Sequence, residues 1–184
     1  MQIRIVPIRI QGRTFQANLL FIEESDRTTI RSLFRAWKKL SSGMRNFKSR
    51  GINIPEGISE SAFALEMRCP RVISVGGVRC SFDNFDLNHN RRLQIKAVSV
   101  DNDLTSFGPK SVWDDLYWLD FYRNGVLDGS FDVYKIPNNL VYRFKVNARQ
   151  TFRDQQNQGK RPRIRIRKCI INPNNLNPIK TCRI

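Results

Sequence analysis

Several features are absent from this sequence, and each absence narrows what the chain can be. It has no run of about 18 apolar residues, so we expect no transmembrane helix. Residues 1–5 do not begin a long apolar segment of the kind that directs secretion, so we expect a cytoplasmic protein. The four cysteines form no CxxC pair, which argues against a zinc knuckle and against a disulfide framework.

Acidic residues are also scarce. The chain has 16 Asp and Glu against 32 Lys and Arg, which gives a net charge of +16. A basic chain of this size usually meets a polyanion such as a nucleic acid. With 184 residues and 40% hydrophobic content, we expect one domain over residues 1–184, with a basic C-terminal extension from about residue 155.

The few acids are unevenly distributed along the chain. Residues 83–132 hold nine Asp and Glu against five Lys and Arg, whereas residues 133–184 hold one against thirteen. A surface that only binds a polyanion has no need of an acidic segment. A divalent-metal site does need one, because hard cations prefer carboxylate oxygens.

The pattern of apolar residues predicts a mixed α/β chain. A helix is expected to begin near Ser25 or Asp26, because apolar residues follow at helical spacing: Ile30, Leu33, Phe34, Trp37 and Leu40. Arg31 and Arg35 lie on another face of it, either as solvated surface or as contacts to phosphates. We expect a loop over residues 41–58, a helix over 59–67, and strands over residues 1–10, 71–75, 78–83, 91–100, from 116 onward, and 131–136.

Residues 78–100 contain the most informative pattern, a predicted hairpin across the loop 87–90. With a four-residue loop, Asp83 lies opposite Gln94, and Lys96 shares their face because side chains alternate along a strand. Asp86 falls on the opposite face, although a β-bulge would reverse this choice. An ordinary surface hairpin would show the same pattern of outward polar residues.

These residues suit metal-dependent hydrolysis of a phosphodiester. Asp83 would bind Mg²⁺ together with the Gln94 amide oxygen and the Ile95 main-chain carbonyl, and the metal would polarise the phosphate. Lys96 would orient the attacking water and offset charge on the phosphoryl oxygens.

A further carboxylate would compensate for the charge that Gln94 lacks. Glu60 is the candidate and Glu66 the alternative. Glu60 also fits a purely structural role, because acids near a helix N-terminus are favoured by the helix dipole.

The chain resembles the PD-(D/E)xK nuclease superfamily at these residues, in a variant with Gln-x-Lys, and more closely a small type II restriction endonuclease. The resemblance covers residues 55–60, 81–83, 94–97, 104–110 and 158–163. It implies a single nuclease domain with a restriction-endonuclease-like core: a central mixed β-sheet flanked by helices. It also implies Mg²⁺ dependence, a homodimer that cuts a palindrome such as GCNGC, and a cognate DNA methyltransferase. Gln94 stands where most of the superfamily has an acid, so the resemblance does not fix the number of metal ions in each active site.

Candidates for DNA contact lie in a loop and in the basic C-terminal part: Ser106, Lys110, Gln158, Lys160, Arg161 and Arg163. Their side chains suit base readout, and equally suit nonspecific phosphate contact. A repair or junction-resolving nuclease of the same fold, or a noncatalytic nucleic-acid-binding protein, would share the charge. A histidine-metal nuclease of the HNH kind is disfavoured because His89 is the only histidine.

Overall fold

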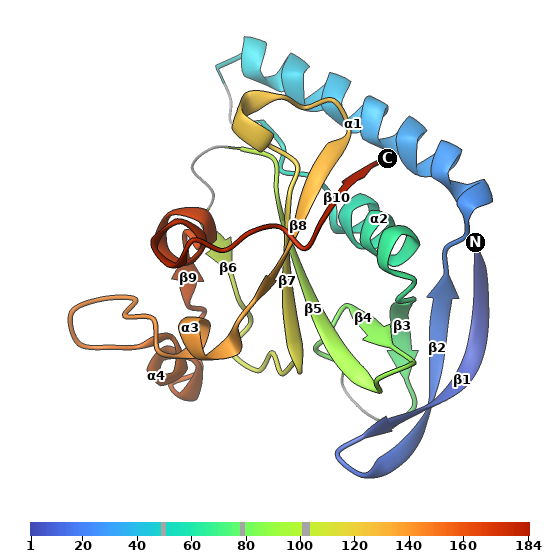
Figure 1. Ribbon diagram of the computed structural model, residues 1–184, viewed down its shortest axis with the longest axis vertical. Helices are drawn as coiled ribbons and strands as arrows, with labels where there is room; N and C mark the ends of the chain where they lie inside the picture. Colours follow the sequence, from blue (N-terminus) through green and yellow to red (C-terminus); the bar gives the residue numbers. More distant parts are fainter. Residues whose placement is uncertain (49–50, 78–79, 101–103) are drawn as a thin grey trace.

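A mixed β-sheet forms the centre of the molecule, and helices cover both of its faces (Figure 1). The computed structural model describes residues 1–48, 51–77, 80–100 and 104–184. Within these residues the sheet has eight strands, in the order β1 (Gln2–Ile10), β2 (Arg13–Phe21), β3 (Arg71–Val75), β4 (Asn84–Asp86), β5 (Arg91–Val98), β7 (Asp115–Asp120), β8 (Ser130–Ile136) and β10 (Lys180–Arg183). Strands β5 and β7 run parallel and the other neighbours antiparallel, which confirms the predicted mixed sheet.

The hairpin of β1 and β2 contacts the loop that follows β4. Gln11 and Gly12 connect β1 to β2 with φ of 50° and 82°, the left-handed pair that suits a two-residue hairpin turn. Asn90, in the loop after β4, accepts a hydrogen bond from the Arg9 N–H at 3.0 Å and donates to the Arg9 carbonyl at 2.7 Å. One end of the edge strand β1 is therefore capped by the loop of the β4–β5 hairpin.

The β4–β5 hairpin has the predicted register. Asn84 pairs with Leu93 and Asp86 with Arg91, across the loop 87–90. The strand predicted over residues 78–83 is wrong for residues 80–83, and residues 78–79 lie outside the described part of the chain. The Ser81 hydroxyl accepts the Val112 N–H at 3.2 Å, and regular pairing with β5 begins only at Asn84.

Two long helices cover one face of the sheet, α1 (Arg27–Asn46) and α2 (Glu56–Met67). The predicted start of α1 is confirmed, but the loop expected from residue 41 is wrong, because α1 continues to Asn46. The Trp37 indole N–H and the Ser41 hydroxyl both donate to the Ile52 carbonyl, at 3.0 and 3.1 Å. These bonds pack the following segment against the end of the helix and outweigh the low helix propensity of residues 41–43.

The other face carries short elements around a second aromatic core. They are α3 (Asn138–Tyr142), α4 (Phe152–Asn157), η3 (Arg167–Ile171) and η4 (Asn172–Asn174), with a small pair of strands, β6 (Thr105–Ser106) and β9 (Arg163–Ile164). The short η1 (Glu24–Asp26) precedes α1, and η2 (Arg123–Gly125) lies between β7 and β8. Residues 163–184, at the end of the basic C-terminal segment, supply buried isoleucines and the strand β10. No helix in the described ranges has the length and apolarity needed to cross a bilayer.

A buried ion pair joins this C-terminal segment to the sheet. Asp120, at the end of β7, is 0% exposed, and its carboxylate contacts the Arg167 guanidinium. The same carboxylate accepts the main-chain N–H groups of Tyr122 and Arg123, at 3.0 and 3.2 Å. Removing one partner of such a buried pair leaves the other charge without compensation.

Asp120→Ala is therefore expected to lower the free energy of unfolding by about 3 kcal/mol, because it removes the acceptor of two main-chain N–H groups and the carboxylate that contacts the half-buried Arg167 guanidinium. Urea denaturation would measure the change. Asp154→Ala is the control: Asp154 is an exposed capping acid on α4, and its loss should cost only about 1 kcal/mol. Equal losses for the two variants would contradict the structural role of Asp120.

Candidate active site

A cavity of about 390 Å³ opens between α2, β5 and the segment that carries β6. We call it the acidic pocket, because three carboxylates line it: Glu56, Glu60 and Asp83. Lys96 is the single basic side chain among the lining residues that the structure describes. The remaining lining residues are Asn53, Ile54, Ser59, Ile95, Ala97, Leu104, Thr105 and Ser106.

Strand β5 fixes the position of the Asp83 carboxylate. Its carboxylate accepts the Ile95 main-chain N–H at 2.7 Å and also contacts the side-chain NH₂ of Gln94. Its own N–H donates to the carbonyl of Leu93, the residue that pairs with Asn84, at 2.9 Å, so the Asp83 main chain is also bonded to β5. The hairpin therefore brings Asp83 and Gln94 together as predicted, and Lys96 lines the same pocket as Asp83.

Gln94 is only 3% exposed, and its amide oxygen has no hydrogen-bond partner among the described residues. A buried acceptor without a partner is rare, and an ion or a water often satisfies it. Turning the amide by half a rotation would place this oxygen beside the Asp83 carboxylate. Two adjacent oxygens would then face a cation, so the residue fits the predicted ligand role.

Glu60 is 9% exposed, and its carboxylate accepts two hydrogen bonds from Arg71, at 2.7 and 3.0 Å. The pKa of Glu60 is raised to about 7, chiefly by burial and then by the negative charge of Asp83, against the lowering effect of Arg71. Burial also raises the pKa of Asp83, against the opposing effect of the Lys96 charge. The pocket thus holds one buried and one half-buried carboxylate with too little positive charge around them, which a bound cation would correct.

Lys96 lies between these carboxylates and the aromatic core. Its ammonium is 5.8 Å from the centre of the Phe107 ring, which is fully buried. A lysine held in this way keeps a positive charge at the mouth of the pocket, where a phosphoryl oxygen would carry negative charge.

Acidic, cysteine and histidine side chains alone do not complete a metal site here. No group of three or more such side chains is arranged to hold an ion anywhere in the described ranges. The remaining donors would have to come from the Gln94 amide and from main-chain carbonyls such as that of Ile95. All of these are hard oxygen ligands, the donor type that Mg²⁺ prefers.

The two alternative acids lie outside the acidic pocket. Asp86 contacts the His89 ring nitrogen at 2.8 Å and accepts the Asn88 N–H at 2.9 Å, so it stabilises the hairpin loop. Glu66 pairs with Arg27 and with Lys180, at 2.8 Å in each case, near the other end of α2.

Sequence reasoning missed Glu56 as a lining residue. It lies one helical turn before Glu60 on α2 and faces the same cavity. The spacing of four residues between two acids was the available signal, since residues i and i+4 share one face of a helix.

The residues predicted to contact DNA lie in two groups, one at the rim of the acidic pocket and one in exposed turns and loops. Ser106 lines the acidic pocket and pairs with Arg163 across β6 and β9, which brings two distant segments of the chain to the rim. Lys110 is exposed in a turn, and the buried side chain of Gln156 fastens that turn by donating to the Gly108 carbonyl at 3.1 Å. The exposed residues Gln158, Lys160 and Arg161 precede β9.

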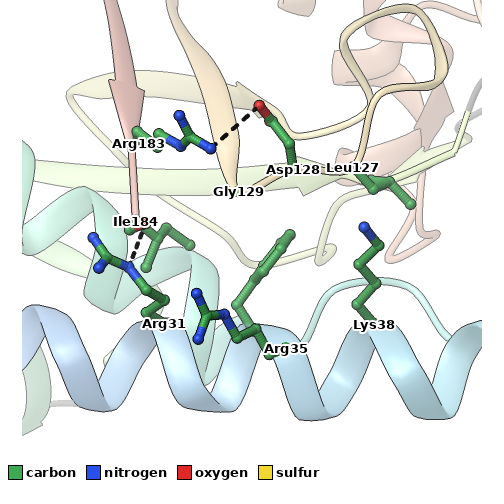
Figure 2. Close-up of a pocket in the computed structure, with 9 residues that line it drawn as sticks. Arg31, Arg35, Lys38, Leu127, Asp128, Gly129, Arg183 and Ile184 are labelled. Atoms are coloured by element: carbon green, nitrogen blue, oxygen red, sulfur yellow. Dashed lines mark hydrogen bonds and ion pairs between the residues drawn. The ribbon is translucent and has the colours of Figure 1, made fainter.

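Arg31 and Arg35 do not reach the acidic pocket. They line a second cavity, between α1 and the C-terminal strand (Figure 2). The predicted catalytic residues and these two arginines therefore lie in separate cavities.

Comparison with known proteins supplies the family. The sequence model of the Bsp6I restriction endonuclease family matches residues 22–173. The type II restriction enzyme Bsp6I of Bacillus sp. (strain RFL6) is 35% identical over 146 residues, which cover 78% of this chain and 79% of that enzyme. No solved structure matches the chain. The chain belongs to the Bsp6I restriction endonuclease family, as its resemblance to type II restriction endonucleases predicted.

Proposed function

We propose that this type II restriction endonuclease hydrolyses both strands of duplex DNA at a short palindromic site, with GCNGC as the candidate, in a Mg²⁺-dependent reaction. The acidic pocket is the catalytic centre, a PD-(D/E)xK site in which Gln94 replaces the second acid. One observation carries the proposal: a hairpin carboxylate, a helix carboxylate and a lysine, Asp83, Glu60 and Lys96, converge on one cavity.

Each residue of the pocket has a distinct task in hydrolysis. Asp83, the Gln94 amide oxygen and the Ile95 carbonyl would hold Mg²⁺, which would polarise the scissile phosphate. Lys96 orients the attacking water and offsets the charge that develops on the phosphoryl oxygens. Water adds to phosphorus, one P–O ester bond breaks, and the leaving oxygen takes up a proton. Glu60 contributes the negative charge that Gln94 lacks, and the alternative acids Asp86 and Glu66 are engaged elsewhere.

The rim of the pocket suits contact with the duplex. Ser106 and Arg163, paired across β6 and β9, stand next to the catalytic residues, and the nearby exposed cations and amides extend this surface: Lys110, Gln158, Lys160 and Arg161. A homodimer would present two such surfaces related by a two-fold axis, which matches the symmetry of a palindrome. A cognate DNA methyltransferase would protect the host DNA.

Plasmid cleavage tests the function directly. The purified protein with plasmid and Mg²⁺ should yield discrete fragments, and EDTA should prevent their formation. Cleavage confined to branched DNA would instead indicate a repair or junction-resolving nuclease. Strong binding to varied DNA without any cleavage would indicate a noncatalytic binding protein.

Substitutions in the pocket test the assignment of residues. Asp83→Ala and Lys96→Ala should each lower the cleavage rate by about 100-fold or more, because each removes a charge needed in the transition state. Affinity for DNA, measured in EDTA, should remain largely intact. Asp86→Ala is the matched control and should still cut; the reverse result would identify Asp86 as the acid.

Glu60→Gln tests the electrostatics of the pocket through stability in EDTA. The folded pKa of about 7 exceeds the ordinary value of 4.5, so ionising Glu60 destabilises the fold progressively as pH rises from 4.5 to 7. Glu60→Gln removes this cost, so its stability relative to wild type should be greater at pH 8 than at pH 4 by up to about 3 kcal/mol. Urea denaturation at both pH values would measure it. An identical pH dependence in the two proteins would refute the burial of a charged Glu60.

A further inference from the structure

The second cavity, which we call the basic pocket, has a volume of about 410 Å³. Its walls are α1, the segment before β8 and the end of β10 (Figure 2). It shares no lining residue with the acidic pocket. The lining residues are Arg31, Phe34, Arg35, Lys38, Leu127, Asp128, Gly129, Arg183 and Ile184.

Four cations line the basic pocket. Arg31, Arg35 and Lys38 lie at spacings of four and three along α1, so one face of the helix presents all three. Arg183 comes from β10 on the other side. Asp128 is the single acid among the described lining residues, and it stands 3.9 Å from the Arg183 guanidinium. The lining therefore has an excess of positive charge.

Two of these cations have no partner within the described part of the chain. Arg31 donates to the main-chain oxygen of Ile184 at 3.1 Å, whereas Arg35 and Lys38 make no hydrogen bond or ion pair with any residue that the structure describes. In Figure 2 the Lys38 side chain extends from α1 toward the segment that carries Leu127. Both side chains are available to an external anion.

The floor of the basic pocket is apolar. Phe34 and Ile184 are each 4% exposed, and Leu127 packs against the same core. The four cations themselves are exposed, so their charged ends stand above this apolar floor and remain open to solvent. The basic pocket therefore combines an apolar floor with accessible cations.

We propose that the basic pocket binds a phosphate group of the DNA backbone, at a position separate from the cleavage site. Its described lining residues include cations but no Asn, Gln, Ser or Thr, so it suits a phosphate better than the edge of a base. A second copy of the chain, with a net charge of +16, is a poor electrostatic partner for this surface. The inference rests on the proposed function only in taking duplex DNA as the ligand.

Binding of duplex DNA in EDTA, measured over a series of salt concentrations, tests the proposal without any cleavage. The variant Arg35→Gln/Lys38→Gln removes the two unpaired cations. The matched control Arg13→Gln/Lys39→Gln removes two exposed cations that line no described cavity, one of them on the same helix. Circular dichroism would show that both variants keep the fold.

The pocket variant should bind DNA about 10-fold more weakly at low salt, and its slope of log affinity against log salt should be shallower by about 2, because two phosphate contacts are lost. The control variant should stay within about 3-fold of wild type. Equal losses in the two variants would overturn the proposal, since total charge alone would then explain them. A change of oligomeric state in the pocket variant alone, measured by sedimentation, would also overturn it. Wild-type protein that binds DNA but does not cut it would contradict the proposed function without contradicting the proposed phosphate site.

Discussion

The pairing of β4 with β5 controls the position of the catalytic groups. Because Asp86 lies opposite Arg91 and Asn84 opposite Leu93, the Asp83 carboxylate contacts the Gln94 side chain and accepts the Ile95 main-chain N–H at 2.7 Å. A slip of one residue would turn Gln94 and Lys96 to the other face of the sheet. The capping of β1 by Asn90 ties this hairpin to the edge of the sheet and opposes such a slip.

The negative charges in the acidic pocket are only partly compensated by the residues around them. Asp83 and Glu60 are both held in an environment that raises their pKa, and Arg71 and Lys96 offset only part of the repulsion. The unpaired Gln94 oxygen adds a buried acceptor without a partner among the described residues. A cation would relieve all of these costs at once, so the features that destabilise the pocket are the ones that would bind metal.

Acidic side chains line one cavity and basic side chains line another, and the two sets come from different segments of the chain. The acidic pocket gathers carboxylates from α2 and from the start of β4, next to one lysine. The basic pocket gathers cations from α1 and β10, and the rim around β6 and β9 adds further basic residues. A nuclease needs both kinds of surface, because its metal site must be acidic whereas its substrate is a polyanion.

Short-range features of the site could be read from the sequence. The length of the loop 87–90 and the alternation of strand side chains predicted that Asp83 and Gln94 would meet, because the register of a hairpin depends on a few adjacent residues. The sequence named Glu60 as the helix acid with Glu66 as the alternative, and the tertiary structure places Glu60 in the acidic pocket. Tertiary structure alone decided that Ser106 meets Arg163. It also placed Arg31 and Arg35 in a cavity of their own. These contacts join segments far apart in the chain, and packing of the whole sheet and its helices determines them.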